Sequence, residues 1–191
     1  SYAARFRDTS GKDVFYSILG VWKTDAVGKP YFDTGVVETI VHEFSHSFVN
    51  PLVKKHEALF EKAGKKIFPL VAAKMKRNSY ATWQTMIAES LVRAATIRYL
   101  IKFESPQSAE KNLRNDEAMG FLWIRELTAL LDQYEKNRDK YPAFDAFMPK
   151  AAAFFNRYTG KIHKKMAEQD ALIKKDLEML RQKGPKILST T

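Results

Sequence analysis

Two histidines and a glutamate lie close together in the chain, in a pattern that could bind a metal and use it. Residues 42 to 46 read H-E-F-S-H inside the otherwise apolar stretch 36–49. Positions i and i+4 share one face of an α-helix, so His42 and His46 could bind one Zn²⁺ at about 2.0–2.1 Å each. Glu43 lies one residue round the helix, where a carboxylate can act as general base on a water molecule that the metal activates. The pattern therefore predicts metal-assisted hydrolysis with Glu43 as the catalytic residue.

A plainer interpretation is a buried helix whose two imidazoles are satisfied by backbone groups or by Glu43. Three polar groups within five apolar-flanked positions are costly to bury without a purpose, which favours the metal interpretation. The chain has no cysteine, so a thiolate-rich structural zinc site is excluded. A metal bound here would be zinc or a similar ion held by nitrogen and oxygen ligands, and a catalytic site needs a third protein ligand.

The third ligand is best sought on a later helix. A histidine six residues after His46 would be one solution, but that position is Leu52. His56 and His163 both lie in charged runs and fit poorly. Glu89 is the strongest candidate, because it is the only acid in a mostly apolar helix expected over residues 80–103, and a buried carboxylate needs a partner.

Arg93 follows Glu89 by four residues. On a helix this spacing allows an ordinary Glu89–Arg93 surface ion pair, which is the simpler alternative to metal binding. If Glu89 binds a metal, Arg93 either orients its carboxylate or contacts substrate. Tyr80, Tyr141 and Arg93 are all candidates for the donor that stabilises an oxyanion, and the sequence does not rank them.

Taken together, H-E-x-x-H followed by Glu89 and Arg93 resembles the gluzincins, zincin metallopeptidases with a glutamate as third zinc ligand. Residues 41–51 and 134–142 also resemble an uncharacterised family of secreted bacterial proteins with a zincin-like domain. The resemblance implies a zincin-like fold and an extracytoplasmic location (periplasmic, cell-surface or secreted), and it names no substrate. Gluzincins often carry an acid where this chain has Arg93, so we consider Glu38, one turn before the first histidine, as a replacement.

The remaining pattern predicts a short β-rich start followed by helices. A strand is expected over residues 14–22 and a short second strand at residues 31–32. The motif helix is expected to start after Thr34 as N-cap and to end at Pro51, since proline disfavours helical geometry in the residue before it. Further helices are expected over residues 51–63, 65–76 (interrupted at Pro69), 80–103 (capped by Ser79), from 105–106 onward, 144–158 and 162–182, with a core stripe at Met119, Trp123, Leu127, Leu130 and Tyr134.

These elements predict an α+β fold that is mostly α-helical, a zincin-like metallopeptidase domain with a reduced small β-sheet at the N-terminus and a helical C-terminal part. We expect one domain over residues 1–183, followed by a tail at 184–191. Within it, residues 1–33 form a β-rich edge region, 34–103 the metal-site helices, and 104–183 a helical lobe.

Composition narrows the partners. The net charge of +10 comes from scattered cation pairs among acids, as on solvated helix faces, so nucleic-acid binding is not expected. No apolar run approaches the ~20 residues that cross a bilayer, and this chain shows no targeting signal.

We expect a zinc-dependent peptidase acting on a peptide or protein substrate, whose backbone could pair with the strand at 14–22. The alternative is a catalytically reduced zincin-like protein that binds a peptide, glycan or protein partner.

Overall fold

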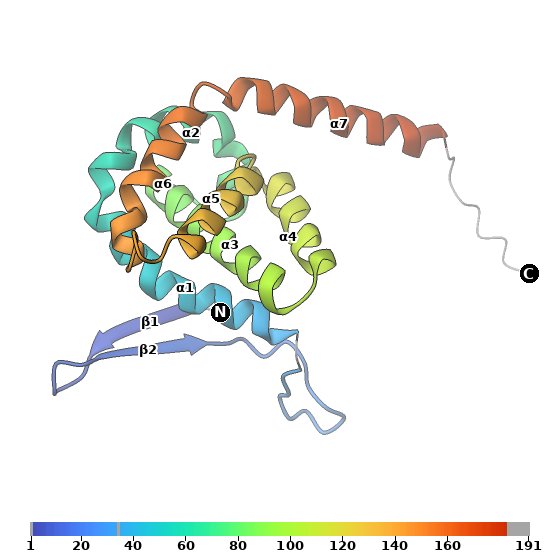
Figure 1. The fold of residues 1–191 in the computed structure, drawn as a ribbon. Helices are drawn as coiled ribbons and strands as arrows, with labels where there is room; N and C mark the ends of the chain where they lie inside the picture. The colour runs from blue at the N-terminus through green and yellow to red at the C-terminus, as the bar shows by residue number, and fades with distance from the viewer. Residues whose placement is uncertain (1, 34, 183–191) are drawn as a thin grey trace, which may run out of the picture.

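Two short strands and seven helices make up the part of the chain that the computed structural model describes, residues 2–33 and 35–182 (Figure 1). This arrangement confirms the predicted α+β class, mostly helical with a small N-terminal sheet. The elements are β1 (Tyr2–Arg7), β2 (Asp13–Ile18), α1 (Val36–Lys55), α2 (Glu57–Arg77), α3 (Trp83–Phe103), α4 (Pro106–Met119), α5 (Ile124–Lys136), α6 (Phe144–Tyr158) and α7 (Ile162–Gln182).

Helix α3, which carries the predicted third ligand, runs through the middle of the helical body (Figure 1). Its sequence is apolar on nearly every face, and such a helix is stable only when other elements surround it. It packs against α1, α2, α4 and α5. Ile87, Leu91 and Val92 are fully buried between these neighbours. A residue on α3 is therefore held in place from several sides.

The predicted core stripe after residue 118 is present, but it comes from two helices. Trp123, Leu127 and Leu130 are buried, whereas Met119 and Tyr134 are partly buried against the same core. Helix α4 ends at Met119 because Gly120 adopts the left-handed conformation, with φ of 108°, that commonly ends helices.

The two strands form an antiparallel hairpin that lies beneath α1 (Figure 1). Its register pairs Tyr2 with Ile18 and Arg7 with Asp13. The strand predicted over residues 14–22 is thus β2, which ends earlier, and its partner β1 was not predicted. The short strand expected at residues 31–32 is wrong, since that region has only an isolated bridge between Thr24 and Pro30.

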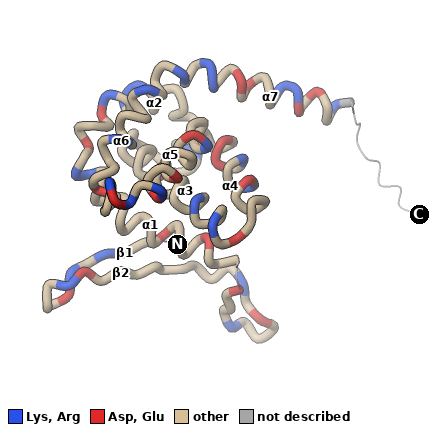
Figure 2. Tube along the Cα trace, in the orientation of Figure 1, with Lys and Arg blue, Asp and Glu red and all other residues tan. Residues whose placement is uncertain are grey.

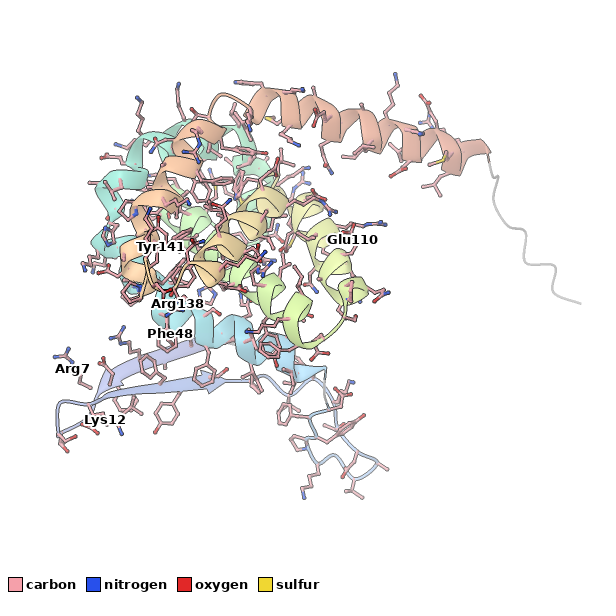
Figure 3. The ribbon with its side chains drawn as sticks, in the orientation of Figure 1. Arg7, Lys12, Phe48, Glu110, Arg138 and Tyr141 are labelled. Carbon is pink, nitrogen blue, oxygen red and sulfur yellow. The ribbon has the colours of Figure 1, made fainter. Side chains whose placement is uncertain are left out.

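One face of the hairpin packs on α1. The rings of Phe15 and Phe48 stack with centroids 5.1 Å apart, and Figure 3 shows Phe48 on the side of α1 that faces the hairpin. The hairpin therefore braces the outside of the helix that carries the H-E-x-x-H motif.

The predicted end of the motif helix at Pro51 is wrong, because α1 continues to Lys55 with Pro51 inside it. A proline within a helix has no N–H to donate to the carbonyl four residues earlier, here that of Ser47. Arg5 of β1 supplies a substitute, donating from Nη1 to the Ser47 carbonyl at 3.3 Å. The Ser47 carbonyl, which Pro51 cannot bind, thus accepts a hydrogen bond that attaches the hairpin to α1.

Helix α2 also differs from the prediction. It runs without a break from Glu57 to Arg77, although Gly64 and Pro69 were expected to divide it. Burial on one face, which includes Phe60 and Ile67, stabilises the helix enough to tolerate both residues.

Helix starts are partly as predicted. The cap of α3 is Thr82 and not Ser79, and its Oγ1 accepts a hydrogen bond from the Thr85 N–H at 3.1 Å. Ser105 is the cap of α4, as expected, with Pro106 as the first helical residue. The predicted cap Thr34 and the tail at 184–191 lie outside the described residues.

No helix in the described part of the chain has the length and apolarity needed to cross a membrane.

Candidate metal centre

Helix α1 brings the two predicted histidine ligands together. His42 and His46 are one turn apart and both partly buried. Their Nε2 atoms face one another at 3.2 Å, and the ring planes are inclined by 80°. Two nitrogens from one helix are thus aimed at a common point.

Glu89 of α3 completes the group. Its carboxylate is only 4% exposed. Oε1 lies 3.4 Å from His42 Nε2, and Oε2 lies 3.4 Å from His46 Nε2. The packing of α1 against α3, which the sequence could not show, brings residues 43 and 47 positions apart in the chain within contact. His42, His46 and Glu89 form a group that could hold a metal ion.

The distances within this group suit a tetrahedral ion. Bonds of about 2.0–2.1 Å place tetrahedral ligands about 3.3–3.4 Å apart, whereas octahedral neighbours with the same bonds would be about 2.9 Å apart. The two imidazole nitrogens are 3.2 Å apart, and each of them lies 3.4 Å from a different oxygen of the Glu89 carboxylate. Two imidazole nitrogens and one carboxylate are also the donor set that zinc accepts. The residues present therefore fit zinc.

Glu89 has two further partners on its far side. Tyr80 Oη donates a hydrogen bond to Glu89 Oε1 at 2.9 Å. Arg93 Nε lies 2.9 Å from the same oxygen as an ion pair, although its N–H is not aimed well enough for a hydrogen bond. The expected Glu89–Arg93 contact is thus present, and it is buried instead of lying on a helix surface.

The charges around Glu89 decide its protonation. Burial alone would raise the pKa of Glu89, but the hydrogen bond with His42 and the positive charge of Arg93 outweigh it and lower the pKa to about 2. Burial and the nearby Glu89 charge raise the pKa of Tyr80, which keeps its hydroxyl protonated. At neutral pH Glu89 is therefore an ionised carboxylate that can accept a cation.

Asp116 of α4 is the residue that sequence reasoning missed. It is buried, and its Oδ1 accepts a hydrogen bond from Arg93 Nη1. Burial raises the pKa of Asp116, and the charge of Arg93 works against that rise. Nothing in the polar run around residue 116 distinguishes this acid from its solvent-facing neighbours, because its importance depends on how α4 packs against α3.

Glu43 lies beside the metal group on α1 and is 9% exposed. It makes no hydrogen bond or ion pair with any side chain that the structure describes. Asn50 and Lys54 follow it by seven and eleven residues, on the same helical row. Both line a cleft of about 510 Å³ that also touches His46 and Glu89. The helical row of Glu43 therefore borders the space next to the metal ligands.

Three other residues considered from the sequence lie away from the metal group, and a fourth, Glu38, lies beside it. Tyr141 packs on Phe147 with ring centroids 5.0 Å apart, at the start of α6 (Figure 3), and not at the metal group. His56 contacts Asp145 at 2.7 Å, and His163 is exposed on α7. Glu38 accepts a hydrogen bond from Asn112 at 3.3 Å and lines a pocket of about 190 Å³ beside the first histidine.

Comparison with known proteins gives a family but no function. The family model described as "Domain of unknown function (DUF4932)" matches residues 1–154, from the hairpin into α6. No curated protein and no solved structure matches the chain.

Proposed function

This chain belongs to the DUF4932 family, which is defined as a domain of unknown function, and from the geometry of its site we propose that it is a zinc-dependent peptidase. One observation carries the proposal. Two imidazole nitrogens of α1 and a buried carboxylate of α3 lie within 3.2–3.4 Å of one another, and the residue after the first histidine is a second buried acid, Glu43.

The metal would be held by His42, His46 and Glu89. Zinc bound by three protein ligands lowers the pKa of a water molecule to ~7 and polarises a carbonyl group, which is the chemistry that peptide hydrolysis needs. The resemblance of the motif to the gluzincins supports this assignment, as does the lowered pKa of Glu89, since a ligand carboxylate must be ionised.

Glu43 would act as the general base. A carboxylate that has no hydrogen bond or ion pair among the described residues is free to take a proton from the attacking water and pass it to the leaving amine. Its burial excludes bulk water from the acceptor, which strengthens its interaction with that proton.

The cleft next to the metal group would receive the substrate. Its walls include Val53, Ala88 and Thr85, which offer apolar contact, and Asn50 and Lys54, which offer hydrogen-bond donors. Tyr80, one of the candidates for stabilising an oxyanion, is committed to Glu89 through its hydroxyl. The cleft has a size typical of small-ligand sites and could take a few residues of an extended peptide.

The test is the variant Glu43→Gln, assayed for zinc content and for cleavage of a peptide library. We expect it to retain zinc, because Glu43 is not a ligand, and to lose hydrolysis by about two orders of magnitude or more. Glu61→Gln is the matched control, since Glu61 is an exposed acid on α2 that pairs with Lys65.

Wild-type turnover in Glu43→Gln would show that Glu43 is not the base. A wild-type protein that binds stoichiometric zinc yet cleaves no peptide would instead support the alternative, a binding protein with reduced catalysis.

A further inference from the structure

The buried contacts behind Glu89 suggest how its carboxylate is presented to a metal. The geometry points to Asp116 as a positioning residue. Through Arg93 and Tyr80 it keeps Glu89 Oε1 occupied and leaves Oε2 as the oxygen that binds the metal. This inference rests on the metal site of the proposed function, but it does not depend on peptide hydrolysis.

The two oxygens of Glu89 have unequal surroundings. Oε1 accepts the hydrogen bond from Tyr80 Oη at 2.9 Å and lies 2.9 Å from Arg93 Nε, besides its 3.4 Å contact with His42 Nε2. Oε2 has only His46 Nε2, at 3.4 Å, among the contacts recorded for the described residues. A carboxylate whose one oxygen accepts a hydrogen bond and pairs with a guanidinium keeps its other oxygen for an ion, and so binds the ion through a single oxygen.

Arg93 is itself fixed by three partners. Its Nη2 donates to Tyr80 Oη at 2.8 Å, its Nη1 donates to Asp116 Oδ1, and its guanidinium carbon lies 5.0 Å from the centre of the Phe121 ring. The contacts therefore form a relay from Asp116 on α4, through Arg93, to Tyr80 and Glu89. The side chain of Arg93 is 17% exposed, so little solvent screens its charge.

Charge explains why the relay needs an acid at its far end. A buried guanidinium next to a ligand carboxylate repels an incoming cation and draws the carboxylate's charge toward itself. Asp116 offsets that positive charge, because it is itself buried and paired with the opposite side of the guanidinium. Without Asp116, we expect Glu89 to be held more tightly by Arg93 and to bind a metal less well.

The experiment measures metal binding by the full chain without any peptide. Zinc affinity is obtained by competition with a chromophoric chelator for Asp116→Asn and Tyr80→Phe. The matched controls are Asp132→Asn, which removes the charge that pairs with Arg98 on the α5 side, and Tyr99→Phe, which changes a tyrosine that packs on Phe103. We expect each relay variant to weaken zinc binding about 10–100-fold, and each control to stay within about twofold of the wild type.

A spectrum separates positioning from general loss of stability. Bound Co²⁺ absorbs visible light strongly in four-coordinate sites and weakly in sites with more ligands. Tyr80→Phe removes one hydroxyl and leaves the packing intact, so it tests the relay even if Asp116→Asn does not fold. We expect the Co²⁺ complex of Tyr80→Phe to absorb more weakly than the wild type, because the released Oε1 can also bind the metal.

Two results would overturn the inference. Zinc affinity and a Co²⁺ spectrum in Tyr80→Phe that equal those of the wild type would show that Oε1 is not held away from the metal by the relay. A wild-type protein that binds neither Zn²⁺ nor Co²⁺ would overturn the proposed function as well. Wild-type metal binding without peptide cleavage leaves the inference standing and contradicts only the peptidase proposal.

Discussion

At the scale of single residues, Glu89 combines deep burial with a negative charge. An unpaired buried carboxylate would be strongly unfavourable, and this one is balanced by Arg93, by the Tyr80 hydroxyl and by two imidazoles. The same surroundings that make Glu89 an ionised ligand also make it part of the folded core. Its charge therefore contributes to stability in the metal-free protein.

The pH dependence of stability should report that contribution. The pKa of Glu89 falls from an ordinary 4.5 to about 2 on folding, so its charge stabilises the fold above pH ~4.5 and this stabilisation is lost as the pH falls toward 2. The shift corresponds to about 3 kcal/mol, of which about 1 kcal/mol is lost by pH 3.5. Between pH 6 and pH 3.5, the difference in unfolding free energy between metal-free wild type and Glu89→Gln should therefore become smaller by about 1 kcal/mol.

Urea denaturation with a chelator present measures this difference. Glu61→Gln serves as the control, because an exposed acid paired with a lysine should give little pH-dependent difference. A gap between wild type and Glu89→Gln that stays constant over this range would contradict the lowered pKa.

Residue types and spacing were enough to predict the three residues that the structure brings together into a group able to hold a metal ion; that they bind one stays a prediction. His42 and His46 follow from helical geometry, and Glu89 follows from its isolation in an apolar helix. The contacts of Asp116 and Tyr80 could not be predicted, because they depend on which helix packs beside α3 and on which residues of the two helices lie opposite one another. From the sequence, Glu89 and Arg93 could equally have formed an ion pair on the helix surface. The structure shows that the pair is buried.

At the scale of elements, prolines and glycines were the main source of error. Pro51 and Pro69 both lie inside helices. At Pro51 a hydrogen bond from Arg5 to the Ser47 carbonyl replaces the missing N–H, and burial of one face stabilises α2 around Pro69. The hairpin partner β1 escaped prediction because its Arg5 and Arg7 side chains interrupt the apolar pattern. Helices α6 and α7 were predicted to the residue.

Gly64 in the middle of α2 has a packing role that a substitution can expose. A Cβ at this position would lie 2.3 Å from Cε3 of Trp83, the first residue of α3. Alanine is favoured over glycine in a helix by about 1 kcal/mol, yet overpacking of this kind costs about 1–3 kcal/mol. We expect Gly64→Ala to lower the free energy of unfolding, against its helix propensity, in chemical denaturation.

Gly160→Ala is the control for this variant, since its nearest neighbour would be the Arg157 carbonyl at 3.6 Å, an ordinary contact. Its unfolding free energy should stay within about 0.5 kcal/mol of the wild type. A stabilised Gly64→Ala protein would mean that Trp83 can move aside, and that the start of α3 is less constrained than its burial indicates.

At the scale of the whole molecule, charged side chains form ion pairs between helices instead of gathering into one basic surface. Lys and Arg are spread over the helices among Asp and Glu in Figure 2. Arg98 of α3 pairs with Asp132 and Glu135 of α5, and Arg125 of α5 pairs with Glu110 of α4. Part of the 32 Lys and Arg side chains is thus engaged with acids within the fold. That the chain does not bind nucleic acid stays a prediction.

A metal at the proposed site would join α1 to α3, and through α3 to the rest of the helical body. A ligand that binds only the folded state stabilises it by about 2.7 kcal/mol at a hundred times its Kd. For a chain of this length each kcal/mol shifts the unfolding midpoint by about 2–4 °C. We therefore expect chelation to lower the Tm of the zinc-loaded protein by roughly 5–10 °C, measured by scanning calorimetry.

Two histidine variants test where the zinc binds. In His46→Ala, chelation should leave the Tm almost unchanged. In His163→Ala, which changes an exposed histidine on α7, chelation should lower the Tm as much as in the wild type. A chelator effect of equal size in both variants would place the bound zinc outside the group formed by α1 and α3.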